Sequence, residues 1–467
     1  MEVNVEAPDL QKVEQWIESA GKNLFEQYPI TVVTSAIIGK DLQDHMNGGE
    51  PRISSIRGHL RFWWRATRGA KYKDAHDLKV WERQIFGDTS LPSPCKLKLT
   101  SVVKNGRKEY SSIPTYVSFP YRDQKKKNKD KNKEEMQFKV FEAAQKNRGL
   151  SFILQIDYLD SLEYLQGQEK PHRWLTAIEV KNEVEAALWA WINFGGIGAR
   201  TRRGCGSLYS AFFSPQAATS EELEGWIKQC VAEYRLPVLN ANEHREWPIL
   251  ALLTEQQNSI AVQEQPDAVM KAWEETVRVY SKFRQKRNWK KDINRKPQPG
   301  RSHWPEPDSL RRITGQSTQL HKSPVSLNPK DDIAFPRAQF GMPIIFRFKD
   351  NIDGKGDPPE TELVPLNKKR LASPLILKSL AVSEDKAFGA MICLVQPPLE
   401  RLQLSSSDAS PEVKEKVENQ TINKKQIYPE KIENSLYPLR NSVPNAVEGF
   451  LRSEVVRQWK KMQPSRR

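Results

Sequence analysis

The segment that most constrains what this chain can fold into is a loop rich in glycine and arginine, Gly195–Ser207. It holds five glycines and three arginines in thirteen residues. Glycine adopts positive φ without steric cost and lets backbone amide groups come close to a ligand, and guanidinium groups supply paired donors that match phosphate oxygens. This combination favours a loop that binds a polyanion over an ordinary glycine-rich turn. The glycines follow a helical pattern, and no Gly-Lys-Ser/Thr comes after them, so the segment is neither a dinucleotide fingerprint nor a Walker loop.

The residues before this loop predict the helix that it ends. Asn182 is the expected N-cap, with Glu185 three positions later as in a capping box, and apolar residues then recur at helical spacing. Gly195 and Gly196 are expected to end the helix. The apolar run at 208–213 predicts a short strand.

A second basic element is predicted at residues 54–68, where tryptophans and arginines are interleaved. On a helical wheel Trp63 and Trp64 share one apolar sector, and four arginines occupy the adjoining sector. These four are Arg57, Arg61, Arg65 and Arg68. No acidic residue lies between Glu50 and Asp74, so a solvated face of mixed charge is the less favoured interpretation. We expect a helix that docks through its tryptophans and presents a row of cations.

The composition of the chain favours an acidic partner. There are 73 Lys and Arg against 58 Asp and Glu, a formal net charge of +15, which makes nucleic acid the first candidate. The four cysteines form no Cys-x-x-Cys pair, so we expect no zinc site, no disulfide framework and no cofactor. The N-terminus lacks the pattern of a signal peptide, and no apolar run approaches the roughly 20 residues needed to cross a bilayer. We expect a cytoplasmic protein without membrane contact.

The order of predicted elements indicates an α+β fold. A predicted helix at 9–28 is followed by a strand at 30–38, and the first half then continues as helix, strand, strand, helix, strand. This is the βαββαβ pattern of a ferredoxin-like domain, the architecture of RNA-recognition (RRM-like) domains. The second half again mixes strands and helices, and we interpret it as a divergent second ferredoxin-like domain with helical additions.

The expected domains are 1–215 and 216–467. Two polar segments, 122–135 and 398–436, are interpreted as long insertions. The first has no apolar side chain with which to offset the entropy of ordering. The second is expected to be mobile.

These motifs resemble the RAMP superfamily of CRISPR effector proteins and, within it, the first subunit of the type III-B Cmr complex. The glycine loop marks the superfamily, and the tryptophan–arginine helix makes the resemblance to the subunit specific. The segments that carry the match are Ile56–Ala66, Ile85–Gly87, Gly195–Ser207, Phe335–Ala338, Phe340–Ile344 and Arg370–Lys378. Thr34–Gly39 departs from the family, which tends to run from Thr-Pro into a Gly-Gly turn there.

The resemblance implies two ferredoxin-like domains and a non-catalytic, RNA-binding scaffold role in antiviral defence. It implies a place at the end of an assembly with other Cmr complex subunits, holding the 3′ part of the CRISPR guide RNA and the adjoining target RNA. The candidate RNA-binding residues are Arg57, Arg61, Arg65, Arg68, Gly196, Gly198, Arg200, Arg202, Arg203 and Arg337.

Two other functions remain open from the residues alone. A metal-independent RAMP endoribonuclease that processes guide RNA would need a general acid and base, most often histidine, and of seven histidines only His59 lies within one of these motifs. A protein-only adaptor would use its basic faces to meet acidic subunits.

Overall fold

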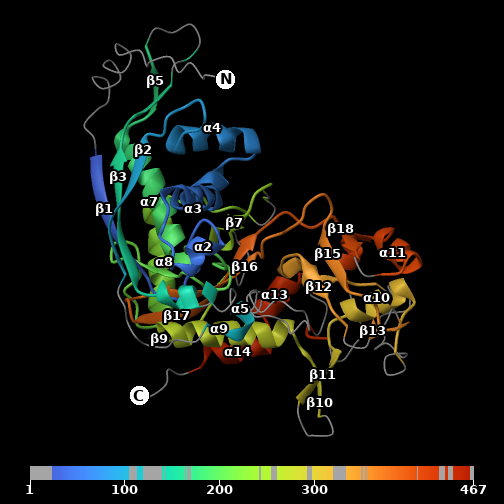
Figure 1. Ribbon diagram of the computed structural model, residues 1–467. Coiled ribbons are helices and arrows are strands. Elements are labelled where there is room, and N and C mark those ends of the chain that lie inside the picture. Colours follow the sequence, from blue (N-terminus) through green and yellow to red (C-terminus); the bar gives the residue numbers. More distant parts are fainter. Residues whose placement is uncertain are drawn as a thin grey trace.

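The computed structural model describes residues 24–462, with its longest internal gaps at 105–112, 119–138, 254–259, 319–332 and 431–436. It is a mixed α/β protein built from several sheets (Figure 1), which confirms the expectation of a fold that mixes helices and strands. The predicted insertion at 122–135 lies outside the described residues. None of the helices in the described part of the chain is long and apolar enough to span a bilayer.

The first sheet has four antiparallel strands in the order β2-β3-β1-β6. Its strands are β1 (Leu24–Val32), β2 (Cys95–Lys104), β3 (Leu150–Tyr158) and β6 (Leu208–Tyr209). Burial alternates along the whole of β3, so one face of the sheet is covered and the other is open. The covered face packs against α3 (Ile53–Ala66) and α7 (Ala177–Phe194). Along the chain these elements follow the predicted order of strand, helix, strand, strand, helix, strand.

The first strand begins earlier than predicted. It starts at Leu24 and runs through Pro29, and it pairs with β3 from Leu24 opposite Tyr158 onwards. Residues 24–28 are therefore strand and not helix, and the rest of the predicted helix lies outside the described residues. Proline is tolerated where a strand is not paired on both edges, and β6 pairs only with Thr31 and the residue after it. The residues around Pro29 indicate the end of a helix, because the pairing of this segment with β3 is not visible in the local sequence.

Helix α7 also begins earlier than predicted. Thr176 is its N-cap and forms a capping box with Glu179, so the predicted cap Asn182 lies inside the helix. Thr176 with Glu179 and Asn182 with Glu185 both have the spacing of a capping box. Ala177 and Val180, which lie before Asn182, are buried, so the helix includes them. The predicted end at Gly195 is confirmed, because the Gly195 amide donates to the Trp191 carbonyl as the C-cap.

A five-stranded sheet follows in the second half of the chain. Strand β17 pairs with β16 along one edge and with three short strands along the other. The elements are α8 (Ser220–Glu233), β7 (Ile249–Leu250), β8 (Ile260–Val262), β9 (Asp267–Ala268), α9 (Val269–Arg284), β16 (Leu375–Ala381) and β17 (Lys386–Val395). Helix α9 packs against β16 and β17, with α13 (Ala446–Leu451) and α14 (Glu454–Lys460) beside it.

A separate four-stranded sheet stands at the far side of the molecule (Figure 1). It consists of β12 (Ile344–Phe346), β15 (Thr361–Pro365), β18 (Arg401–Ser405) and β19 (Thr421–Asn423), with α10 (Glu306–Thr314), α11 (Pro411–Glu418) and α12 (Lys424–Ile427) around it. The expectation that 398–436 is mobile is wrong for its described part, which supplies two of these strands and two of these helices. Leu402, Ile422 and Ile427 are fully buried in the apolar cluster of this unit. A few apolar residues at suitable spacing are enough to order a polar segment when they pack in the core of a sheet.

The remaining elements are short. They are α2 (Leu42–Met46), the 3-10 turns η1 (Arg68–Lys71), η3 (Ala251–Leu253) and η5 (Pro336–Phe340), α4 (Ala75–Phe86), α5 (Thr115–Ser118), β4 (Ser161–Glu163), β5 (His172–Leu175), β10 (Arg287–Lys291), β11 (Pro297–Ser302), β13 (Asn351–Ile352) and β14 (Lys355–Gly356).

The main apolar core runs across residue 215, the expected domain boundary. It contains Trp189 and Trp191 of α7 together with Leu223 of α8 and Ile376 of β16. The division into domains 1–215 and 216–467 stays a prediction, and the core ties the two stretches together.

A buried lysine joins the two halves at the end of α7. Lys378 of β16 is fully buried, and its ammonium group donates to the carbonyl oxygens of Ile192 (3.0 Å) and Gly195 (2.7 Å). These are carbonyl groups of the last helical turn, which have no partner within the helix. A strand of the second half thus completes the helix that leads into the glycine loop.

We predict that Lys378 makes stability depend on pH. Burial lowers the pKa of Lys378 to about 7, whereas in the unfolded chain it is about 10.4. Between these values the unfolded state binds more protons, so the contribution of Lys378 to the free energy of unfolding rises with pH. Lys378→Met should be less stable than wild type, and in urea titrations from pH 7 to pH 10 the gap should widen by up to about 1.4 kcal/mol per pH unit. Parallel pH profiles for the two proteins would contradict this account.

Candidate nucleic-acid interface

The glycine loop folds back on itself and against the segment that follows β1. The amide of Ile197 donates to the Gly206 carbonyl (2.9 Å), that of Ala199 to Ile37 (2.8 Å), and that of Gly206 to Ser35 (3.0 Å). These amide groups are thus used inside the protein and are not available to a ligand.

The glycines are needed for close backbone packing. Gly198 and Gly206 have φ of +86° and +64°, and a Cβ at either position would overlap a carbonyl oxygen, of Ile37 and Ile197 respectively. A Cβ at Gly196 would lie 2.8 Å from the Gly206 carbonyl oxygen. Contact of Gly196 and Gly198 with RNA stays a prediction.

Two of the loop arginines reach into the second half of the protein. Arg202 donates to the Ser373 carbonyl (2.7 Å), and burial lowers its pKa to about 10. Arg203 donates to the Leu375 carbonyl (3.3 Å) and lies 4.9 Å from the centre of the Tyr280 ring. Together they fasten the loop to β16 and α9.

The third loop arginine sits where the chain turns. Arg200 has a left-handed backbone, with φ of +63°, and its carbonyl accepts the Arg203 amide at 2.8 Å. This conformation is strained for a residue with a Cβ. The turn sets the direction of the side chains that follow it.

The arginine row on α3 is opposed by carboxylates from other helices. Arg61 and Arg65 share Glu82 of α4, with N–O distances of 2.5 and 2.6 Å, and each arginine side chain is about one third exposed (32% and 33%). Helix α3 ends at Ala66, so the predicted fourth member of the row, Arg68, lies in η1, where it pairs with Glu183 of α7. The expectation of an unopposed row is therefore wrong, because the acids come from positions remote in sequence. The tryptophans do dock the helix as predicted, since Trp63 and Trp64 are buried.

Part of the row keeps an excess of positive charge. Glu82 pairs with Arg61 and Arg65, and among the residues that the structure describes none of the acids lies within ion-pair distance of Arg57. A shared carboxylate orients two guanidinium groups while leaving the group of three cationic.

Arg337 is held in the interior by an ion pair. Its guanidinium lies 2.9 Å from Glu306, whose side chain is fully buried, and the Arg337 side chain is 13% exposed. The Arg337 amide donates to the same carboxylate (2.7 Å). Breaking such a buried pair is expensive, so this residue braces η5 against α10.

Helix α3 and the glycine loop meet at a small cavity of about 180 Å³, which we call the α3–loop hollow. Its walls are His59, Phe62, Trp63, Phe194, Gly195, Gly196, Thr201, Arg202 and Ile376. The Arg202 guanidinium lies 5.3 Å from the centre of the Phe62 ring. The two motifs are visible in the sequence, but their meeting point and the wall residues Phe62 and Thr201 are not, because they depend on how α3 packs against the loop.

His59 lies in the wall of this hollow. Its ring stacks on Trp191 with centroids 5.9 Å apart and an interplanar angle of 12°, and burial lowers its pKa. Burial thus favours the neutral imidazole, which suits the packing of His59 on Trp191.

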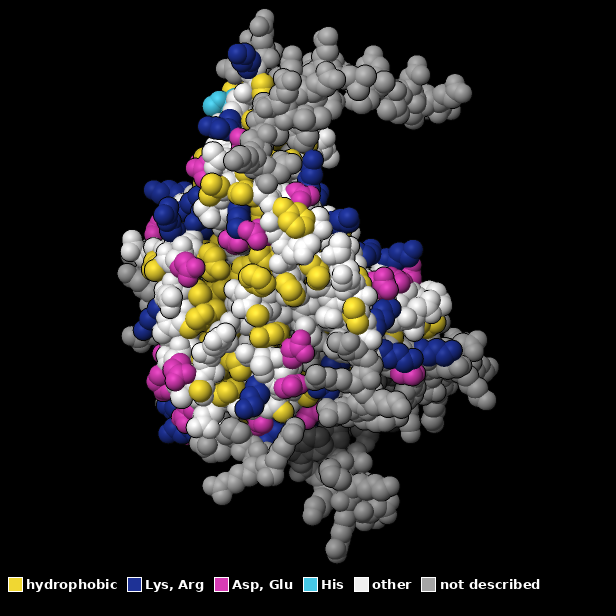
Figure 2. All heavy atoms as spheres, turned by 90° about the vertical axis from the view of Figure 1, so that its left-hand side faces the viewer, with side chains coloured by type: hydrophobic (Ala, Val, Ile, Leu, Met, Phe, Trp, Pro, Cys, Tyr) yellow, Lys and Arg dark blue, Asp and Glu magenta, His cyan; other side chains and the backbone are white. Residues whose placement is uncertain are grey.

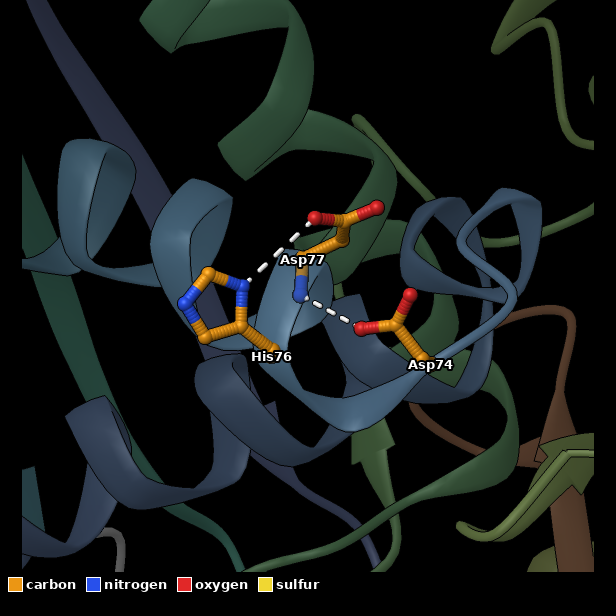
Figure 3. A group of neighbouring side chains, drawn as sticks. All are labelled: Asp74, His76 and Asp77. Carbon is orange, nitrogen blue, oxygen red and sulfur yellow. Dashed lines mark hydrogen bonds and ion pairs between the residues drawn. The ribbon is translucent and has the colours of Figure 1, made fainter.

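One group of side chains in the described part of the chain has the composition of a metal site. The possible ligand atoms of Asp74, His76 and Asp77 lie within 4.8 Å of one another, and all three residues are exposed (Figure 3). Asp74 is the N-cap of α4 and accepts the Asp77 amide at 2.9 Å, and His76 lies 3.7 Å from Asp77. Helix capping accounts for this arrangement.

The open face of the first sheet is not a basic platform. Apolar side chains lie there among both positively and negatively charged side chains (Figure 2). Phe25 of β1 is 50% exposed there. This face therefore differs from the two arginine-bearing elements, which lie on the covered side of the sheet.

We predict opposite effects for two alanine substitutions at glycines. Gly206→Ala forces a Cβ into the backbone at positive φ, so it should lower the free energy of unfolding by at least about 2 kcal/mol. Gly58→Ala in α3 meets open space and should stabilise the protein by about 0.5–1 kcal/mol. Urea or thermal unfolding measures both. Equal effects at the two positions would mean that the loop is not packed as described.

Comparison with known proteins gives matches to one superfamily. The family model described as the RAMP superfamily matches residues 29–209, which confirms the resemblance seen in the motifs. The chain is 28% identical over 160 residues to CRISPR system Cmr subunit Cmr1-1 of Pyrococcus furiosus, covering 34% of this chain and 40% of that protein. It is 29% identical over 161 residues to subunit Cmr1-2 of the same organism, covering 33% of this chain and 80% of that protein. The chain is thus homologous to Cmr1 over about a third of its length.

Two solved structures have weaker similarity. Apo Cmr1 from Pyrococcus furiosus aligns over 81% of this chain and 89% of its own, with 16% identity and a TM-score of 0.41. A chain of the type III-B Cmr-beta complex bound to cognate target RNA aligns over 85% of this chain and 98% of its own, with 12% identity and the same TM-score. Similarity at this level carries no conclusion about function.

Proposed function

We propose that this protein is a non-catalytic, RNA-binding subunit of a type III-B CRISPR effector complex. It acts in the cytoplasm beside other Cmr complex subunits, where it holds the 3′ part of the guide RNA and the adjoining target RNA. The observation that carries the proposal is the homology to two Cmr1 subunits. The net charge of +15 supports a polyanionic partner.

The proposal includes two ferredoxin-like domains. For the first, the support is the strand order β2-β3-β1-β6 with helices on one face, the order expected when βαββαβ units form one antiparallel sheet. For the second, the support is weaker: β16 and β17 form a hairpin over α9, but the other strands do not repeat the first order.

The proposed RNA contacts centre on the α3–loop hollow. Arg57, Arg61 and Arg65 lead along α3 and Arg200 lies at the turn of the loop, while Arg202 lines the hollow and is held by the Ser373 carbonyl. Guanidinium groups that are a third exposed and held by one carboxylate are oriented for phosphate without being neutralised. Such contacts position an RNA and do not read its sequence, which guide–target pairing would do.

Four of the candidate arginines act in this proposal by holding the site. Arg68 is paired with Glu183, Arg202 bonds to the Ser373 carbonyl, Arg203 bonds to β16, and Arg337 is paired with Glu306. Each is committed to an internal partner, so each supports the geometry of its neighbourhood and does not touch phosphate.

We predict that the α3 row contributes directly to RNA affinity. Arg61→Gln/Arg65→Gln should weaken binding of guide RNA by the full chain and reduce the slope of log affinity against log salt by about 1.4, for two lost phosphate contacts. Glu82→Gln is the matched control. It removes the shared partner and should cost about 1–3 kcal/mol of stability. Because it removes a negative charge and so raises the net positive charge, it should not weaken RNA binding. An unchanged salt slope in the double variant would remove the row from the interface.

We also predict that the purified chain does not cleave RNA. Burial favours the neutral form of His59, which is stacked on Trp191, and none of the other wall residues of the hollow is a general acid near neutral pH. Labelled guide precursor should stay intact with and without chelator. Cleavage that is lost in His59→Ala would establish the endoribonuclease alternative, and assembly with Cmr subunits without any RNA binding would establish the adaptor.

A further inference from the structure

A large groove in the second half of the molecule is lined by cations. It has a volume of about 890 Å³, the size of pockets that hold extended ligands. Its walls are the end of α9, the chain at Pro438 and Leu439, and the facing parts of α13 and α14. The charged residues of the lining are Lys282, Lys286, Arg287, Arg452, Glu454 and Arg457.

The two walls differ in how their charge is balanced. Arg452 pairs with Glu448, and Arg457 pairs with Glu454 at 2.8 Å. On the opposite wall, Lys282 and Lys286 are exposed, and Arg287 is half-buried. Among the described residues, no carboxylate lies within ion-pair distance of these three cations. The α9 wall therefore carries three unopposed charges, unlike the row on α3.

The end of α9 accounts for one of these three charges and leaves the other two unexplained by folding. A cation in the last turn of a helix offsets the helix dipole, and Lys282 serves that purpose in α9. Lys286 and Arg287 lie beyond the end of the helix. Arg284, between them in sequence, turns inward to the hydroxyl of Tyr116 at 3.1 Å, whereas Lys282 and Lys286 are exposed at the groove. Three like charges facing one groove repel one another unless an anion is present.

We propose that this groove, which we call the α9–α14 groove, is a second site for single-stranded RNA backbone. The inference rests on the proposed RNA-binding function and adds a contact remote in sequence from the glycine loop. The ammonium groups of Lys282 and Lys286 and the guanidinium of Arg287 contact phosphates from one wall. The paired arginines of the other wall limit the width of the groove. Lysine ammonium groups on flexible stems suit phosphate as point charges, so the site holds RNA without sequence preference.

The test compares two triple variants of the full-length chain. Lys282→Gln/Lys286→Gln/Arg287→Gln removes the unopposed wall. Lys414→Gln/Lys416→Gln/Lys424→Gln is the matched control, because it removes three cations that are each paired with a carboxylate on the separate four-stranded unit. Circular dichroism and thermal unfolding verify that both variants fold.

Binding of a mixed-sequence single-stranded RNA is measured over a range of salt, with polyglutamate as a competitor. The groove variant should bind on the order of tenfold to a hundredfold more weakly at 0.1 M salt, with a salt slope smaller by about 2 for three lost phosphates, while the control variant binds like wild type. Equal binding by the groove variant and wild type would overturn the groove site and leave the proposed function standing. Loss of polyglutamate binding with RNA binding retained would assign the groove to an acidic protein. Failure of wild type to bind RNA would overturn both proposals together.

Discussion

The close backbone packing of the glycine loop is the interaction on which the rest of the structure depends. The loop lies between the segment after β1 and strand β16, and its glycines leave no room for a side chain at Gly198 or Gly206. Lys378 completes the last turn of α7 from the opposite side. The two halves of the chain therefore meet at the point where α7 ends, and a shift of one half relative to the other would disturb the contacts of the loop.

Charge in this protein has two distinct uses. Arg61, Arg65 and Arg68 pair with carboxylates, and Arg202 and Arg203 donate to carbonyl groups, all from elsewhere in the fold. These contacts fix the direction of the side chains and weaken the electrostatic field that they present to a ligand. Among the described residues, the cations at the end of α9 have no carboxylate partner, and Arg287 donates only to the neighbouring Gln285 carbonyl. The net charge of +15 does not distinguish these groups, since an arginine paired with a carboxylate and a lysine without such a partner each contribute one positive charge to the sum. The braced arginines supply geometry, and the α9 cations supply long-range attraction.

Several features could be predicted from local sequence because their causes are local. The end of α7 at Gly195 and the docking of α3 through Trp63 and Trp64 follow from glycine chemistry and apolar periodicity. Predictions were wrong where a distant partner decided the outcome. Strand pairing with β3 extended β1 through Pro29. The apolar cluster around β18 ordered a segment that is polar in composition.

The sequence by itself determined that the chain is basic, mixes helices and strands, and carries two arginine-bearing motifs that resemble the RAMP superfamily. Only the tertiary structure decided which of those arginines are opposed. Glu82 and Glu183 lie on other helices, and Glu306 is 31 positions from Arg337. Ion pairing acts over a few ångströms in space and is indifferent to separation along the chain, so no local pattern reveals it. For the same reason the hollow between α3 and the glycine loop, and the groove between α9 and α14, exist only once the helices have packed.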